Sequence, residues 1–151
     1  MSLMSTGQVI TESLLAHGVD TVFGIPGAHM YDFNDALAQR QDRLRFITTR
    51  HEQGAGYMAY GYAKSTGKVG TFTVVPGPGV LNAGAALCTA YGANAPVLCV
   101  TGNIMSYLIG QGRGQLHELP DQLALLRGLT KWSERMSGGV APSMRYASSR
   151  T

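Results

Sequence analysis

Three predicted strands run directly into turn segments, and this arrangement constrains the fold more than any other feature of the sequence. The segments are residues 24–27 (Gly-Ile-Pro-Gly), 50–53 (Arg-His-Glu-Gln) and 76–79 (Pro-Gly-Pro-Gly). Each follows a short apolar run and precedes a helical pattern. Strands that alternate with helices in this way form a parallel sheet, whose strands all end at one edge. We therefore expect the three segments to lie together, where such sheets bind ligands.

The rest of the sequence continues this alternation. Strands are predicted over residues 21–23, 44–49, 71–75 and 96–101, and helices over residues 31–39, 52–67, 80–90 and 119–127. A first helix is expected before them, capped by Thr6 and ended by Gly18. The expected fold class is α/β, a three-layer αβα arrangement around a mostly parallel sheet.

The length of 151 residues suits one domain. We expect a leader over residues 1–5, the domain over residues 6–136 and an atypical tail over residues 137–151. The tail is rich in Gly and Ser and has no apolar periodicity, whereas a doubly wound sheet would continue with a helix and an edge strand. The last helix and strand of the fold are therefore expected to be missing.

Composition and charge argue against several classes of protein. Twelve Lys and Arg against nine Asp and Glu leave a net charge of only +3, which disfavours a dedicated nucleic-acid-binding surface. The sequence has no apolar run of about eighteen residues and no signal-peptide pattern, so neither a membrane span nor export is expected. Cys88 and Cys99 lack the spacing of a metal site or a disulfide framework. We expect them to be buried thiols in a cytoplasmic protein.

Glu52 is the residue expected to carry out chemistry. It follows an apolar strand and opens a helix that begins with small residues, which would let a ligand or a second subunit approach. The alternative is that Glu52 only stabilises the helix N-terminus, because a carboxylate there interacts favourably with the helix dipole. The residue pattern alone leaves both open.

A second candidate is the turn formed by Gly77 and Gly79, which Asn82 follows. It is similar to a phosphate-binding cradle at a helix N-terminus, but Asn82 stands where the dinucleotide fingerprint has a third glycine. The alternative is a tight turn that lets the helix approach the sheet closely.

The remaining candidates are a loop and three histidines. The loop over residues 110–115 is either a mobile ligand clamp or a flexible crossover, because its glycines permit both. His29, His51 and His117 have no partner at a helical spacing that suits a metal, so each is expected to be structural or to lie at the surface. No metal site is predicted.

Several segments together resemble one family, the N-terminal pyrimidine-binding (PYR) domain of thiamine diphosphate-dependent enzymes. The resemblance rests on residues 18–19, 22–27, 50–55 and 58–63, and on Gly77-Pro78-Gly79 with Asn82. It is closest to acetolactate synthases, with benzoylformate and related 2-oxoacid decarboxylases as cousins, and it covers about residues 6–136. The implied fold is the PYR type of the thiamine diphosphate-binding fold.

The resemblance also implies roles for individual residues. In the family, the glutamate of the Arg-His-Glu-Gln motif hydrogen-bonds N1′ of the cofactor's aminopyrimidine, which implies that role for Glu52. This contact favours the 4′-imino tautomer, which removes the thiazolium C2 proton and prepares the cofactor to attack a 2-oxo acid. The residues implied to line the pyrimidine side are Pro26, Gly27, Pro76 and Asn82. Gln115 falls where acetolactate synthases have a glutamine near the reacting carbons.

Three positions depart from the synthase pattern. Val75-Pro76 replaces a small hydroxylated residue followed by Gly, Gly114 replaces a phenylalanine, and His29 stands where a glycine or small apolar residue is usual. The sequence therefore leaves open which 2-oxo acid is used, and whether it is decarboxylated or joined to a second carbonyl.

The family's diphosphate-binding motif, Gly-Asp-Gly with an Asn, does not occur in this sequence. In family members a separate domain uses that motif to hold Mg²⁺ and the diphosphate. The chain is therefore expected to supply half of an active site, as a truncated piece of a longer enzyme or as a naturally short chain, and to be inactive and bind thiamine diphosphate weakly alone. The expected partner is a diphosphate-binding domain of the parent chain or of another subunit, within a homodimer or larger oligomer.

Three alternatives remain. One is a stand-alone PYR subunit that works with a separately encoded partner, and another is a non-catalytic oligomerising module. A domain that binds a nicotinamide dinucleotide ranks last, because the fingerprint around Gly77 is incomplete.

Overall fold

Four parallel strands form one sheet in the order β2-β1-β3-β4. The structure, a computed structural model, describes residues 3–136. The strands are β1 (Thr21–Gly24), β2 (Arg45–Thr48), β3 (Gly70–Val74) and β4 (Val97–Thr101). The register pairs Gly24 with both Thr48 and Thr73, so the carboxyl ends of β1, β2 and β3 lie level at one edge. The predicted parallel sheet is confirmed.

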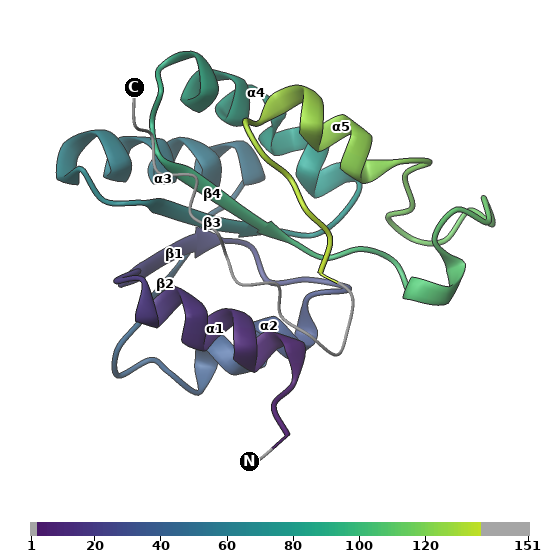
Figure 1. Cartoon of the computed structure of the whole chain (residues 1–151), viewed down its shortest axis with the longest axis horizontal. Helices are drawn as coiled ribbons and strands as arrows, with labels where there is room; N and C mark the ends of the chain where they lie inside the picture. The colour runs from purple at the N-terminus through teal and green to yellow at the C-terminus, as the bar shows by residue number, and fades with distance from the viewer. Residues whose placement is uncertain (1–2, 137–151) are drawn as a thin grey trace.

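Helices cover both faces of this sheet (Figure 1). One layer contains α1 (Thr6–Ala16) and α2 (Tyr31–Ala38), and the other contains α3 (Glu52–Thr66), α4 (Pro78–Gly92) and α5 (Gln122–Leu129). A short 3₁₀ turn, η1 (Ser106–Leu108), lies between β4 and α5. The predicted three-layer α/β fold is confirmed. Within residues 3–136 no strand follows α5, and the predicted tail at residues 137–151 lies outside the described residues.

Alternation along the strands divides the interior into two apolar cores. Phe23, Phe72 and Val74 pack with residues of α3 and α4 on one face. Val22 points to the other face, where it packs with residues of α1 and α2 such as Leu14. Because successive strand residues point to opposite faces, the two cores confirm that both faces of the sheet are covered.

Small residues bring α3 close to α4 and to β3. A Cβ atom on Gly56 would lie 2.6 Å from the Cβ of Ala86 on α4, and one on Gly70 would overlap the carbonyl oxygen of Ala59. Larger side chains at these positions would push the helix away from the sheet. This close packing fixes where α3 begins, and therefore where Glu52 lies.

The helix boundaries differ from the prediction at three N-termini. The helix predicted from residue 80 begins at Pro78, which suits the first helical position because proline has no amide hydrogen to leave unpaired. Ser5, and not Thr6, caps α1: its hydroxyl accepts from the Gln8 amide at 3.2 Å, and the Gln8 side chain accepts from the Ser5 amide at 2.9 Å. This reciprocal pair is a capping box. The last helix begins at Gln122 instead of residue 119, because the Asp121 carboxylate accepts from the Ala124 amide at 2.9 Å and so caps it.

The prediction that both cysteines are buried is wrong for Cys88 and only partly correct for Cys99, which is half-buried on the edge strand β4. The buried positions of α4 include Ala83, Ala86, Leu87 and Ala90, so Cys88 faces outward and is exposed. Burial raises the pKa of the Cys99 thiol on β4 to about 12, which keeps that thiol protonated. In the described part of the chain, no helix combines the length and apolarity needed to cross a bilayer.

Candidate active site

The N-terminus of α3 places Glu52 at the carboxyl edge of the sheet. His51 is the N-cap residue, and its Nδ1 accepts a hydrogen bond from the Gln53 amide at 3.1 Å. The Thr49 hydroxyl, just after β2, donates to the His51 carbonyl oxygen at 3.0 Å and steadies the connection. Glu52 is therefore the first residue of α3, as predicted, and His51 has a structural role there.

Glu52 meets Asn82 of the neighbouring helix α4. Asn82 Nδ2 donates to Glu52 Oε2 at 3.0 Å. Glu52 is half-buried and Asn82 is exposed, so the pair lies at the surface of the edge. Among residues 3–136 no other hydrogen bond or ion pair engages the Glu52 side chain, which leaves Oε1 as an acceptor for an external N–H donor. The structure thus brings together two of the predicted site residues that the sequence separates by thirty positions.

The Gly77 turn has the geometry of a tight turn, and its Gly77 amide is not available to a phosphate. Gly77 has φ +63°, and its amide donates to Gln122 Oε1 at 2.8 Å, so the amide is already engaged inside the protein. A Cβ on Gly79 would lie 2.8 Å from Val75 Cγ2, which shows how closely α4 approaches the end of β3. The glycines of this turn therefore serve close packing.

The other residues predicted to line the cofactor lie around the same edge but differ in exposure. Pro26 is exposed and Gly27 is half-buried, with so little room that a Cβ would lie 2.5 Å from Val75 Cγ1. Pro76 is less than 2% exposed and in this chain supports the turn without offering surface to a ligand. The assignment of these three residues to a cofactor site stays a prediction.

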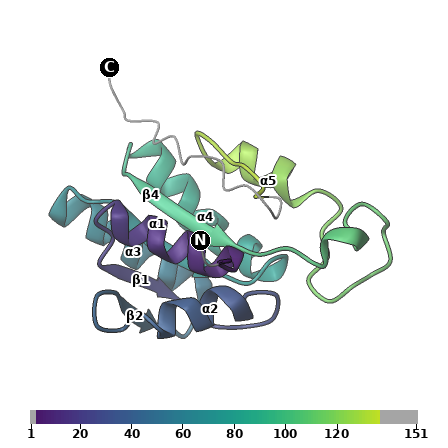
Figure 2. The same ribbon diagram turned by 60° about the horizontal axis from the view of Figure 1, so that its bottom comes forward.

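Gln115 lies in the long connection between β4 and α5, which extends away from the sheet (Figure 2). Residues 110–116 are all exposed, and their glycines 110, 112 and 114 have positive φ angles of 61–81°. At the end of the loop, the Gln115 amide donates to Glu118 Oε2 at 2.8 Å. Within the described residues no hydrogen bond links Gln115 to Glu52. The geometry leaves the clamp and crossover alternatives for this loop open.

Three residues at this edge were not expected to belong to a site. Gln122 is 6% exposed and joins two loops, since it accepts from the Gly77 amide and donates to the Gly102 carbonyl oxygen at 2.8 Å. His29 and His117 are in ring contact, although they lie on different loops. No local spacing signals these contacts; the only hint is that His29 departs from the synthase pattern.

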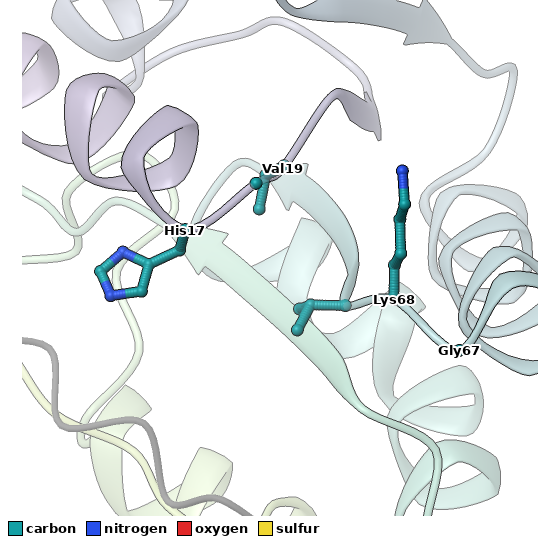
Figure 3. Close-up of a pocket in the computed structure, with 6 residues that line it drawn as sticks. His17, Val19, Gly67 and Lys68 are labelled. Carbon is teal, nitrogen blue, oxygen red and sulfur yellow. The ribbon is translucent and has the colours of Figure 1, made fainter.

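A shallow hollow lies at the opposite edge of the sheet (Figure 3). It has a volume of about 480 Å³ and its lining is His17, Gly18, Val19, Gly67, Lys68 and Val69. Val69 directly precedes β3 and Val19 lies two residues before β1, so the hollow is at the amino edge, away from Glu52. The His17 ring points away from Lys68 in Figure 3, so the hollow gathers no cluster of functional groups.

Asp20, beside this hollow, is the centre of a polar network. Its carboxylate forms an ion pair with Lys68 at 2.8 Å and accepts from the Tyr62 hydroxyl at 2.7 Å. The hydrogen bond from Lys68 is the main reason that the pKa of Asp20 is well below its ordinary value, and the bonds from Tyr62 and Thr21 add to it. Desolvation, followed by the bond to Asp20, raises the pKa of Tyr62. The network fastens α3 to the start of β1.

Among residues 3–136, no three His, Cys, Asp or Glu side chains gather in a way that could hold a metal ion. The groups that meet at the N-termini of α3 and α4 are the Glu52 carboxylate, whose Oε1 has no partner among the described residues, and the Asn82 amide that orients it. Such a set can accept or hold a proton at Glu52 Oε1.

Comparison with known proteins decides the family. The model of the thiamine pyrophosphate enzyme N-terminal TPP-binding domain matches residues 4–125. The chain belongs to this thiamine pyrophosphate enzyme family. The resemblance predicted from the motifs is confirmed, while the domain bounds of 6–136 stay a prediction.

Relatives of this TPP-binding domain include both decarboxylases and synthases. A probable 2-ketoarginine decarboxylase of Pseudomonas aeruginosa is 42% identical over 130 residues, which are 86% of this chain and 23% of that protein. The acetolactate synthase large subunit of Haemophilus influenzae is 40% identical over 133 residues, which are 88% of this chain and 22% of that protein. The chain thus spans less than a quarter of the length of these relatives.

Proposed function

We propose that this TPP-binding domain supplies the pyrimidine side of a thiamine diphosphate-dependent active site that acts on 2-oxo acids. The observation that carries the proposal is the Asn82–Glu52 hydrogen bond of 3.0 Å. It orients a half-buried carboxylate at the carboxyl edge of the sheet and leaves Oε1 free. A free carboxylate oxygen at this edge suits a protonated ring nitrogen of an aminopyrimidine.

Glu52 would act by holding a proton between its Oε1 and N1′ of the aminopyrimidine. When bound, thiamine diphosphate supplies a nucleophilic carbon and an electron sink for the carbanion that decarboxylation leaves. Asn82 keeps Glu52 Oε2 occupied, so that Oε1 is the oxygen presented to the cofactor. The residues we assign to direct contact with the cofactor are Pro26, Gly27, Glu52 and Asn82, with Gln115 on the substrate side. Pro76, which is buried, would support the turn beneath them.

The diphosphate and Mg²⁺ would be held by another domain, from a longer parent chain or a partner subunit. The outer surface of α3 offers a face for such a domain. Tyr57 and Met58 are 39% and 42% exposed, and Gly54 and Gly61 have nothing within 4 Å of where a Cβ would stand. These four positions lie on one side of α3, opposite the side that carries the buried Ala55 and Ala59. We propose that this α3 face is covered in a cytoplasmic homodimer or larger oligomer.

The α3 face can be tested through the oligomeric state. Gly61→Arg should shift the protein toward monomer in sedimentation velocity, because the long side chain blocks close approach. Gln41→Arg, an exposed change beside the other helix layer, should leave the distribution unchanged. A wild-type chain that remains monomeric at high concentration would count against self-association through this face.

The relatives' names support 2-oxo acid chemistry of two kinds, decarboxylation and the joining of two carbonyl compounds. We infer that the same Glu52 contact would serve either outcome, since both begin at the cofactor. The exposed Gln115 loop would then take part in choosing between substrates.

The deciding experiment uses this chain assembled with a diphosphate-binding domain, with Mg²⁺ and thiamine diphosphate added. Carbon dioxide release from pyruvate and from 2-ketoarginine is measured for wild type, for Glu52→Gln and for Glu134→Gln, an exposed control. Loss of a general acid–base group lowers kcat by about 10²- to 10⁴-fold, so Glu52→Gln should fall in this range. The control should keep wild-type activity.

The alternative of a non-catalytic oligomerising module makes the opposite prediction. If Glu52→Gln leaves every activity of the assembly intact, Glu52 has only its helix-terminal role and the catalytic proposal fails. The chain alone should bind thiamine diphosphate weakly or not at all, and micromolar affinity in a calorimetric titration would overturn that expectation.

A further inference from the structure

His29 and His117 form a contact that joins two loops at the carboxyl edge of the sheet. Their ring centroids are 5.7 Å apart and the rings are inclined by 72°, an edge-to-face arrangement. His29 lies between β1 and α2, and His117 lies between η1 and α5. The contact therefore ties the Gly-Ile-Pro-Gly turn to the loop that contains Gln115.

The backbone at both histidines is in the left-handed region. His29 has φ +64° and His117 has φ +68°, values that are uncommon for residues other than Gly, although Asn, Asp and His adopt them more often than the rest. The backbone of each histidine packs against a glycine that could not carry a side chain. A Cβ on Gly77 would lie 2.5 Å from the His117 carbonyl oxygen, and one on Gly102 would overlap the His29 carbonyl oxygen. Such strained residues are held in place by their surroundings and are frequent at functional sites.

A second feature of His117 lowers the stability of the folded chain. Its Nδ1 is buried and has no hydrogen-bond partner in the described residues. A buried ring nitrogen without a partner lowers stability, whichever tautomer is present. The positive φ angles of both histidines and the unpartnered ring nitrogen each lower the stability of the folded chain. A contact that costs stability in this way favours a functional role.

The contact positions a short turn that contains Gln115. His29 Nε2 lies 3.1 Å from the carbonyl oxygen of Leu116, and because a carbonyl only accepts, Nε2 donates. The turn is closed by two more hydrogen bonds, from the Glu118 amide to the Gln115 carbonyl oxygen at 2.9 Å and from the Gln115 amide to Glu118 Oε2 at 2.8 Å. Upstream of this turn, residues 110–114 are exposed. His29 thus provides the side-chain hydrogen bond that ties the turn to the loop after β1.

We propose that His29 is a positioning residue that holds the Gln115–Glu118 turn, so that Gln115 faces the 2-oxo acid. His29 acts through the Leu116 carbonyl and through its ring contact with His117, and it does not touch the substrate. The substrate-side role of Gln115 rests on the proposed function, whereas the hold of His29 on the turn does not.

The first test measures amide hydrogen exchange in the chain itself. In His29→Asn the left-handed backbone remains accessible, but the shorter side chain cannot reach Leu116. The Glu118 amide should then exchange at least about tenfold faster, because the turn it closes opens more often. His17→Asn, at the opposite edge, is the matched control and should leave Glu118 exchange unchanged.

A second variant keeps this test decisive if His29→Asn does not fold. His29→Gln provides a longer side chain with an N–H donor, so it should restore slow exchange at Glu118 at least in part. Equal exchange at Glu118 in wild type and in a folded His29→Asn protein overturns the proposal. Fast exchange at Glu118 in the wild type itself overturns it as well.

The second test measures coupling between His29 and Gln115 in the assembly with a diphosphate-binding domain. His29→Asn and Gln115→Ala should each lower kcat/KM for the 2-oxo acid about tenfold, mainly through KM, and the double variant should lose about tenfold rather than a hundredfold. Affinity for thiamine diphosphate should not change. Additive losses mean that His29 does not act through Gln115.

The two tests separate this proposal from the proposed function. If no assembly shows thiamine diphosphate-dependent activity, the proposed function fails, and with it the substrate-side role of Gln115. The exchange result then still decides whether His29 holds the turn. If activity is present and depends on Glu52, but the coupling is absent, only the role of His29 fails.

Discussion

Gly77 and His117 approach each other so closely that no side chain fits between them: a Cβ on Gly77 would lie 2.5 Å from the His117 carbonyl oxygen. Gly77 also has φ +63°, which a side chain would strain. The turn after β3 and the loop before α5 are thus packed backbone against backbone. This contact helps to hold the Gln115–Glu118 turn at the carboxyl edge.

We expect Gly77→Ala to destabilise the chain by about 2–4 kcal/mol, because the new methyl group meets backbone and the φ angle is strained as well. Gly110→Ala is the matched control, since Gly110 has φ +81° but nothing within 4 Å of a Cβ. The free energy of unfolding of the control should fall by only about 1 kcal/mol, from the strained φ angle alone. Urea unfolding measures both; equal losses would show that the His117 contact adds nothing.

Asn82→Ala should lower the catalytic activity of the assembly without unfolding the domain. The substitution leaves Glu52 Oε2 without its donor, so either oxygen can turn toward the cofactor, and kcat/KM should fall about tenfold. Asn82 is exposed, and the free energy of unfolding should change by less than about 0.5 kcal/mol. Asn82→Asp should be worse than Asn82→Ala, because it places a second carboxylate against Glu52. Equal activity of all three proteins would refute the orienting role.

Thr73→Val should stabilise the chain by about 1 kcal/mol. The Thr73 hydroxyl is buried on β3 and has no hydrogen-bond partner in the described residues, and Val has nearly the same shape. Thr89→Val is the control, since the Thr89 hydroxyl donates to the Ala85 carbonyl oxygen at 2.9 Å. The control should bring no gain. Chemical unfolding of both variants checks the prediction, and a less stable Thr73→Val protein would point to a bound water at this hydroxyl.

Acid should remove the stabilisation that the Asp20–Lys68 pair provides. The pKa of Asp20 is lowered in the folded state, so its contribution is complete above the ordinary value of about 4 and is lost as the pH falls below it. The side chains are 41% and 56% exposed, so solvent screening limits this contribution to about 1 kcal/mol or less. The stability difference between wild type and Asp20→Asn should therefore shrink between pH 6 and pH 3.

Exposed Asp42 provides the control for the acid experiment. Asp42→Asn should follow the wild-type curve of unfolding free energy against pH. Added salt should reduce the effect of Asp20→Asn at pH 6, because the ion pair is open to solvent. A difference between wild type and Asp20→Asn that grows on acidification would contradict the assignment.

Much of the fold could be predicted from local patterns. Short apolar runs and Gly- or Pro-rich turns predicted each strand, and the strand–helix alternation predicted a parallel sheet. The order β2-β1-β3-β4 was not predicted, because strand pairing depends on contacts between distant segments. The cap at Ser5 was missed because Ser5 and Thr6 are equally good candidates, and only the reach of the Gln8 side chain decides between them.

The candidate site also has a part that the sequence predicted and a part that it did not. Glu52 could be placed from the sequence, since its position depends on neighbours such as His51, which caps the same helix. His29 and His117 were expected to be structural or to lie at the surface, and nothing in their local spacing signals a contact. Gln122 gave no signal either, because its two partners, Gly77 and Gly102, lie on other loops.

The sequence by itself determined the elements, the edge to which Glu52 belongs and the family, because these follow from short-range patterns and motif spacing. Only the tertiary structure decided that Asn82 donates to Glu52, that the Gly77 amide is engaged by Gln122, and that two histidines meet. The physical reason is that local propensity selects helix or strand, whereas contacts between loops depend on how the helices and sheet pack together.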